Sequence, residues 1–265
     1  MWLAVFFAIP MVTMASTSLQ EGSLERGFEF TGNWRTYTDS IALYDSQMMR
    51  SIGYGLIVTI LTLVISYPMA YWIAQKAGRA KNLFLLLMLL PFFTPFLIRT
   101  LSWRFILADE GIFLGTLKDW GVVGEGFRLL ATSTSVVAGM TYNFLPFMAL
   151  PLYLALERLD PSLLDAAYDL YSNKRQAFLR VTLPHSLPGV LAGSLLTFIP
   201  AVGDFIDADL LGGVNQTVIG QVIYREFLTN FDYPSGAALS FVLMGGILLG
   251  VFLYVRALGT EDLTG

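Results

Sequence analysis

The sequence predicts an all-α integral membrane protein with six transmembrane helices. Hydrophobic residues make up 55% of the 265 residues and charged residues only 14%, and the mean hydropathy is +0.63. Apolar runs recur along the chain at lengths near the ~20 residues that a helix needs to cross a bilayer. Polar loops of alternating charge character separate these runs. We therefore expect residues 1–265 to form a single transmembrane domain.

Six apolar runs supply the expected spans. They are Trp2–Ala15, Ile52–Ala74, Leu83–Leu107, Ser133–Leu156, Val190–Ile206 and Gly236–Val255. As a helix the second run would measure about 34 Å, enough to cross a hydrocarbon core of about 30 Å. The first run is short, and neither Lys nor Arg precedes it. We interpret it as a clipped first helix rather than a secretory signal peptide.

The distribution of basic residues predicts the orientation of these spans. Basic side chains gather after the second span and between the fourth and fifth spans, as Lys76, Arg79, Lys81, Arg158, Lys174, Arg175 and Arg180. The loops after the first and third spans are instead rich in Asp and Glu. Because Lys and Arg accumulate on the cytoplasmic side of short loops, both termini and both basic loops are expected in the cytoplasm.

A polar amphipathic segment, residues 157–189, separates the fourth and fifth spans. Asp160 is a good helix N-cap with Pro161 behind it. Apolar residues then recur on one helical face, at Leu163, Leu164, Ala167, Leu170 and Tyr171. A second short helix is expected around Lys174–Val181, and the sequence Leu183-Pro184 to Pro188-Gly189 is expected to stop it before the next span.

This segment resembles the cytoplasmic loop of the permease subunits of ATP-binding-cassette (ABC) importers. Asp165-Ala166-Ala167 stands for the E-A-A of that motif, and Phe178, Val181, Leu183-Pro184 and Pro188-Gly189 match its tail. Tyr171 occupies the place of the family's glycine, although tyrosine disfavours the positive φ that glycine adopts freely. The resemblance implies a type I importer permease fold. It also implies ATPase contacts through Leu164, Asp165, Ala166, Ala167, Asp169, Leu170, Tyr171, Phe178 and Pro184.

The resemblance implies partners as well. The chain contains no G-x-x-x-x-G-K-[ST], so it lacks the loop that holds nucleotide phosphates in ATPases. In the family, ATP and Mg are used by two copies of a cytoplasmic ATPase, a second homologous permease completes the pathway, and an extracytoplasmic binding protein delivers substrate. We therefore expect a transport subunit of the bacterial inner membrane that is not an enzyme, binds no cofactor, and contacts lipid but no nucleic acid.

Catalytic and metal sites are not expected in this chain. The absence of cysteine excludes disulfides, thiolate metal sites and cysteine nucleophiles. The single histidine, His185, lies in the proline-rich end of the polar segment, and we interpret it as a polar loop residue rather than a ligand or base.

Acidic residues at membrane depth indicate the candidate substrate path. Asp204 falls near the outer end of the fifth span, where an ionisable group is costly and by default functional. Asp207 shares its helical face if the helix continues, although it could equally cap the span at the interface. Two such carboxylates favour a cation, and aromatic faces complete an ammonium site. The candidates are Asp204, Asp207, Trp103, Tyr142, Asn143 and Phe205, with Tyr71 as a further aromatic and Trp103 and Tyr142 open to anchoring or packing roles.

Four stretches resemble the spermidine/putrescine permease subfamily in particular. They are Pro91–Trp103, Thr141–Tyr153, Gly203–Gly213 and Ile219–Ser240. The resemblance implies ATP-driven import of polyamines. Subfamilies that import ferric iron, opines or other organic cations share parts of these patterns, and a self-sufficient secondary transporter or channel with Asp204 as a relay is the remaining alternative. The resembling subunits begin further upstream, so Met1 is either a real difference or a misplaced start.

Overall fold

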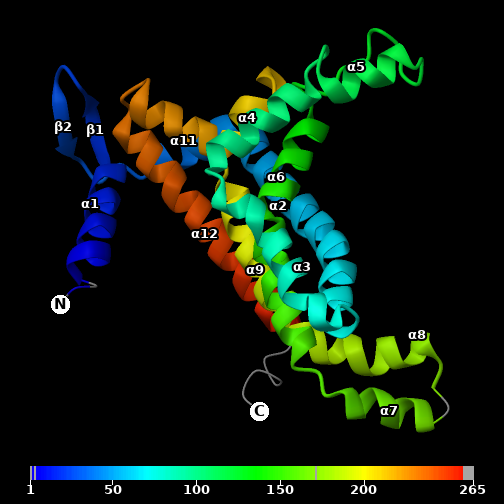
Figure 1. Ribbon diagram of the computed structural model, residues 1–265. Helices are drawn as coiled ribbons and strands as arrows, with labels where there is room; N and C mark the ends of the chain where they lie inside the picture. The colour runs from blue at the N-terminus through cyan, green and yellow to red at the C-terminus, as the bar shows by residue number, and fades with distance from the viewer. Residues whose placement is uncertain (1, 3, 171, 259–265) are drawn as a thin grey trace.

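The computed structural model describes residues 2, 4–170 and 172–258, and almost all of them are helical (Figure 1). The longer helices are α1 (Ile9–Ser18), α2 (Arg35–Gln75), α3 (Lys81–Leu89), α4 (Phe96–Leu107), α5 (Ile112–Asp119), α6 (Ser133–Glu157), α7 (Pro161–Asp169), α9 (Leu183–Gly203), α11 (Ile219–Leu228) and α12 (Tyr233–Leu258). Shorter helical pieces are η1 (Ala4–Ala8), η2 (Gly78–Ala80), η3 (Leu90–Phe93), α8 (Lys174–Ala177), η4 (Phe178–Thr182), α10 (Ile206–Leu211) and η5 (Val214–Gln216). Strands β1 (Gln20–Ser23) and β2 (Gly27–Phe30) form an antiparallel hairpin.

Helices α2, α6 and α9 form the centre of the bundle (Figure 1). Met148 and Leu152 of α6 are fully buried there with Ala70 of α2. Glycine makes the contact between α6 and α9 close, because a Cβ at Gly189 would lie only 2.7 Å from the carbonyl oxygen of Pro151. Gly189 belongs to the Pro-Gly of the family-like motif, so this part of the motif serves helix packing.

Four helices are long and apolar enough to cross a membrane, and a bent pair of helices makes up to five. The four contain the expected second, fourth and sixth spans and most of the fifth, which ends at Gly203 rather than Ile206. The expected first span is a shorter apolar helix, Val5–Ser18, which lies to one side of the bundle in Figure 1. Of the six spans that the sequence predicts, four are continuous helices and a fifth is the broken pair, whereas the first corresponds to a helix below the length of the others.

The expected third span is not one straight helix. Its two parts, Gly78–Phe93 and Phe96–Asp119, are bent by 90° at the residues between them. Thr94 and Pro95 have extended backbone, with ψ of 135° and 138°. A residue before proline is pushed out of the helical region, so Pro95 forces the break at Thr94. The break directs α4 across the end of the bundle.

The proline stop predicted after the second short helix is wrong. The chain is helical without interruption from Lys174 to Gly203, through both Pro184 and Pro188, although Figure 1 shows a change of direction between α8 and α9. The π-helical turn η4 ends at Thr182, two residues before the first proline, and such a wider turn can accommodate a residue without an N–H. His185, predicted in a loop, is helical, and its Nδ1 lies 2.8 Å from the Val181 carbonyl oxygen.

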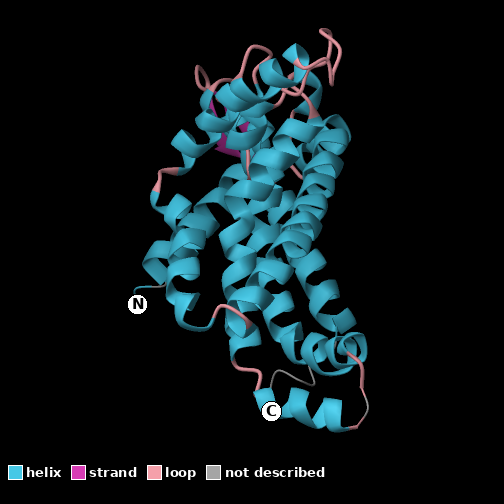
Figure 2. Ribbon diagram, turned by 45° about the vertical axis from the view of Figure 1, so that its right-hand side comes forward, coloured by secondary structure: helices cyan, strands magenta, loops and turns pink. Residues whose placement is uncertain are grey.

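The two ends of the bundle differ in construction. The hairpin β1–β2 and α5 lie at one end, and α7 lies at the other (Figures 1 and 2). The acidic loops of the sequence prediction are therefore at the opposite end from the segment 157–189. Figure 2 shows that most loops gather at the hairpin end.

Candidate functional site

A buried polar cluster joins three helices near the end opposite α7. Asp207 of α10 is 0% exposed, and its Oδ1 accepts hydrogen bonds from Thr100 Oγ1 of α4 at 2.7 Å and from Asn143 Nδ2 of α6 at 2.9 Å. Asn143 Nδ2 also lies 3.1 Å from Asp207 Oδ2 and 2.9 Å from Thr100 Oγ1. Thr100 and Asn143 are themselves 0% exposed. The cluster therefore fixes α10 against both α4 and α6.

Asp204 lies in the same region, but in a turn rather than in the continuous helix that the sequence predicted. The expected continuous helix is wrong, because α9 ends at Gly203 and Asp204 has extended backbone with ψ of 123°. Its Oδ1 accepts the backbone N–H of Ile206 at 3.0 Å, at the start of α10. The turn places Asp204 two residues before α10, so its carboxyl group lies near that of Asp207 even though no continuous helical face joins them.

Two acceptor atoms beside this turn are buried and carry no hydrogen bond within the described residues. They are Oδ2 of Asp204 and Oδ1 of Asn143. A buried acceptor without a donor is costly, so such atoms in a native site call for a ligand or a second conformation that satisfies them. Both would accept an N–H of an ammonium group.

Two of the predicted aromatic residues form one wall near this cluster. Trp103 of α4 and Tyr142 of α6 meet edge to face, with ring centroids 5.5 Å apart. They line a cavity of about 290 Å³ together with Thr94, Arg99, Ser102 and Ile106. Tyr142 and Asn143 are neighbours in sequence, so the cavity and the acidic cluster occupy adjoining parts of α6.

The other two predicted aromatics lie elsewhere. Phe205 stacks on Tyr224 of α11, with centroids 5.1 Å apart. Tyr71 packs edge to face against Phe178, at the α7 end of the bundle and away from the acidic residues. Sequence reasoning also missed Thr100. Its position three residues before Trp103 on one amphipathic turn was the available signal, but its partner lies 107 residues away.

Helix α7 carries the second candidate surface. Asp160 caps it by accepting the backbone N–H of Ser162 at 2.9 Å, and this hydrogen bond lowers the pKa of the Asp160 carboxyl. Apolar side chains remain exposed on the helix: Leu163 is 40% exposed and Leu170 is 81% exposed. Within the chain α7 contacts α8 and η4 (Figure 1). An exposed apolar surface on a projecting helix is typical of a protein-binding site.

The remaining coupling candidates are divided between this surface and the bundle. Asp165, Ala166 and Asp169 are exposed on α7, whereas Leu164 and Ala167 are half-buried. Phe178 is directed inward, with its ring 5.7 Å from Tyr67 and 6.2 Å from Tyr71 of α2. Pro184 is exposed on α9. Tyr171 lies outside the described residues.

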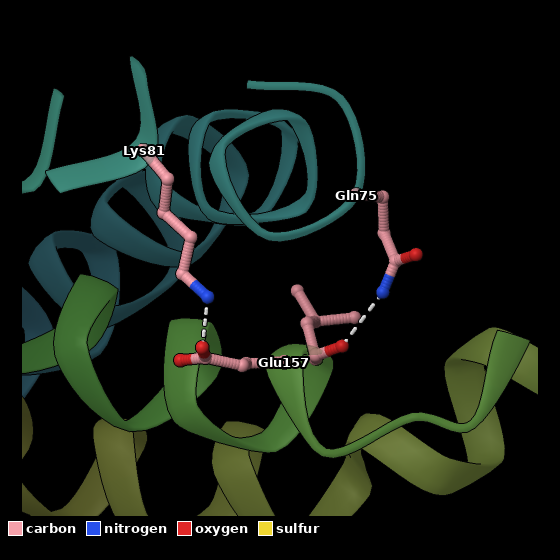
Figure 3. A network of polar contacts seen from close by, with 4 residues as sticks. Gln75, Lys81 and Glu157 are labelled. Atoms are coloured by element: carbon pink, nitrogen blue, oxygen red, sulfur yellow. Dashed lines mark hydrogen bonds and ion pairs between the residues drawn. The ribbon is translucent and has the colours of Figure 1, made fainter. Parts of the chain in front are cut away.

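A polar network ties the base of this segment to the rest of the molecule (Figure 3). Lys81, at the start of α3, pairs with Glu157, the last residue of α6. Gln75 Nε2, at the end of α2, donates to the Leu156 carbonyl oxygen at 2.8 Å. The residues before α7 are thereby joined to the corner between α2 and α3.

The described residues contain no group of three or more His, Asp or Glu side chains able to hold a metal ion.

Comparisons with known proteins place the chain in a family. Residues 63–258 match the inner membrane component of binding-protein-dependent transport systems. The spermidine/putrescine transport system permease protein PotB of Haemophilus influenzae is 38% identical over 257 residues, which is 97% of this chain and 90% of that protein. PotB of Escherichia coli is 36% identical over 96% of this chain and 92% of its own length. The E. coli inner membrane ABC transporter permease protein YdcU is 33% identical over 81% and 72%.

Solved structures show the same fold. A chain of the bacterial ABC transporter that imports the acidic polysaccharide alginate superposes with a TM-score of 0.70 at 18% identity, covering 95% of this chain and 89% of that one. A chain of the methionine ABC transporter MetNI in an inward-facing form gives 0.61 at 17% identity, covering 83% and 97%. Family, relatives and apolar helices agree on a multi-pass inner-membrane location. The chain belongs to the family of inner membrane components of binding-protein-dependent transport systems.

Proposed function

We propose that this chain is the transmembrane subunit of an ATP-driven ABC importer of polyamines such as spermidine and putrescine. The observation that carries the proposal is the 36–38% identity to PotB proteins over nearly the whole chain. The acidic and aromatic residues at the hairpin end support it, because a polyamine offers ammonium groups to carboxylates and to ring faces.

The proposal includes a particular membrane arrangement. Residues 1–265 form one transmembrane domain of six spans, with the broken pair α3–α4 counted as the third and α1 as the first. Both termini and the segment 157–189 face the cytoplasm, as the basic loops predict. The acidic cluster then lies toward the outside, where an extracytoplasmic binding protein would deliver the substrate.

ATP hydrolysis is coupled to the transmembrane helices through α7. Two copies of an ABC ATPase supply ATP hydrolysis, and one of them receives the exposed apolar face around Leu163 and Leu170. A second, homologous permease chain forms the other half of the path. Asp204, Asp207, Asn143, Trp103 and Tyr142 line this chain's half. Phe205 does not line the path but helps to hold the turn at Asp204 in place, through its stacking on Tyr224.

Uptake by the reconstituted complex tests the proposal. The chain is expressed with its partner permease, ATPase and binding protein in cells without polyamine importers, and uptake of labelled spermidine is measured against unlabelled putrescine and ferric citrate. We expect uptake that needs this chain and ATP and that putrescine blocks. An assembled complex without spermidine uptake would refute the polyamine assignment, and block by ferric citrate would point to a ferric importer.

Asp204→Asn tests the acidic site within the same assay. The substitution replaces an ionisable carboxyl group with an amide of nearly the same shape, so we expect the KM for spermidine to rise at least fivefold while the complex still assembles. Asp209→Asn is the matched control, because Asp209 is exposed on the neighbouring helix and bonds only Gln221 in the described part of the chain. Equal kinetics in the two variants would remove Asp204 from the path.

A further inference from the structure

Arg99 of α4 is a buried cation that the acidic pair does not neutralise by direct contact. Its side chain belongs to a residue only 7% exposed, and its Nε is buried without a hydrogen bond in the described part of the chain. None of the ion pairs found among the described residues includes it. Burying a charge without a partner is costly, so a stable protein keeps one only where another interaction or a function compensates.

Aromatic rings supply the direct contacts of the guanidinium, and the Asp207 carboxyl attracts it from beyond ion-pair distance. The guanidinium carbon of Arg99 lies 5.4 Å from the ring centroid of Phe92 and 5.7 Å from that of Phe96. These distances are within the range of cation–π attraction, which strengthens when the cation is desolvated. The two rings come from opposite sides of the break at Thr94-Pro95, so the arginine also joins the halves of the broken span.

Arg99 also lines two cavities. One is the cavity of about 290 Å³ with Trp103 and Tyr142. The other, of about 350 Å³, has walls that are mostly phenylalanine, from Phe92, Phe93, Phe96, Phe144 and Phe147. Arg99 and Thr94 line both, and Arg99 is the charged side chain among the lining residues of each. The guanidinium therefore lies where a cation in either cavity would meet a fixed positive charge.

We propose that Arg99 controls cation passage. Its guanidinium occupies the site between the Phe92 and Phe96 rings, here called the aromatic seat, and excludes other cations until a substrate ammonium group displaces it. A fixed positive charge beside a narrow passage excludes cations electrostatically, and this effect is strong where water is scarce. The substrate class that can displace it is an organic cation with at least two ammonium groups, because one group can bind the acidic turn at Asp204 while a second replaces the guanidinium over the rings.

This inference rests on the proposed function for the substrate, but its test does not. The complex of both permeases and the ATPase is reconstituted in vesicles loaded with labelled tetramethylammonium, which is permanently charged and cannot cross lipid in a neutral form. Efflux is measured without ATP. We expect Arg99→Gln to raise efflux at least tenfold over the native complex, because the electrostatic barrier is gone.

Two substitutions control for charge and position. Arg99→Lys retains a cation and is expected to stay within about twofold of the native rate. Arg104→Gln removes an exposed arginine from the same helix and is expected to leave efflux unchanged. Equal efflux from Arg99→Gln and Arg104→Gln would overturn the proposal, as would native-like efflux from an assembled Arg99→Gln complex that still hydrolyses ATP.

The aromatic seat gives a second, independent variant if Arg99→Gln does not assemble. Phe96→Leu keeps apolar volume but removes one ring face, so the guanidinium is held less firmly and efflux should rise about threefold. Native efflux from an assembled Phe96→Leu complex would then overturn the proposal. A native complex that imports no spermidine, combined with leaking Arg99→Gln vesicles, would refute the polyamine assignment and leave the barrier intact.

Discussion

The two ends of the molecule depart in opposite ways from the usual burial of apolar side chains and exposure of polar ones. At one end α7 exposes apolar side chains, with Leu170 81% exposed. At the other end Asp207, Asn143 and Thr100 bury polar groups completely. Exposed apolar surface costs solubility, and buried polar groups cost desolvation that hydrogen bonds among them offset. Under the proposed function, the α7 end binds a protein partner and the hairpin end a charged or polar cargo.

The largest expected effect comes from the buried end. Asp207→Leu removes the carboxylate that accepts from both Thr100 and Asn143, so these two buried donors keep only the longer bond to the Phe96 carbonyl oxygen and the bond from Asn143 to Thr100. We expect the free energy of unfolding in detergent to fall by about 3 kcal/mol. Asp209→Leu, at an exposed position of the same helix, should change it by about 0.5 kcal/mol or less. If the two variants lowered the free energy of unfolding by similar amounts, the buried cluster would contribute no more to stability than an exposed residue.

An intermediate effect is expected at the exposed end. Leu170→Arg should leave the melting temperature of the isolated chain unchanged, because the side chain is almost fully exposed. It should weaken binding of the ATPase about tenfold, equivalent to about 1.4 kcal/mol. Val214→Arg is the matched control, since Val214 is 93% exposed on η5. Co-purification of the ATPase measures both, and undiminished binding by Leu170→Arg would argue against α7 as the docking site.

The smallest effect concerns the cap of α7. The pKa of Asp160 lies below its ordinary value of 3.8 because the carboxylate accepts the Ser162 N–H. A lowered pKa stabilises the folded form above the ordinary value, and this stabilisation is lost as the pH falls through the folded pKa. Amide hydrogen exchange at Ser162, followed from about pH 5 to about pH 2, should therefore accelerate relative to the intrinsic rate. Asp160→Asn does not titrate and should show no such step.

Local signals predicted most of the helices but not their interruptions. Apolar length located the spans around Ile52–Ala74 and Gly236–Val255, and N-cap chemistry located α7 at Asp160. Proline was less informative. Pro95 breaks its span by 90°, whereas Pro188 lies inside α9. Proline alone therefore does not fix where a helix breaks; beside Pro188, Gly189 packs α9 closely on α6.

The acidic site was only partly predictable. Membrane depth singled out Asp204 and Asp207, but the assumed helical face does not exist. Their approach depends on the turn after Gly203, and their neighbours Thr100 and Asn143 come from helices distant in sequence. Helix α11 was also missed. Its apolar positions Ile219 and Val222 are buried against α12 and α2, in a stretch too short and polar to register as a span.

The uninterrupted helical run from Lys174 to Gly203 changes direction near the prolines and so consists of two arms of unequal length. The arm formed by α8 and η4 has nine residues, and at 1.5 Å per residue it is about 14 Å long. The arm formed by α9 has 21 residues and is about 32 Å long. Gly189 clamps the run to α6 close to the elbow. If the run rotated as a rigid body about the junction of the two arms, a displacement of the short arm would reach the turn at Asp204 enlarged about twofold, in the ratio of the two lengths.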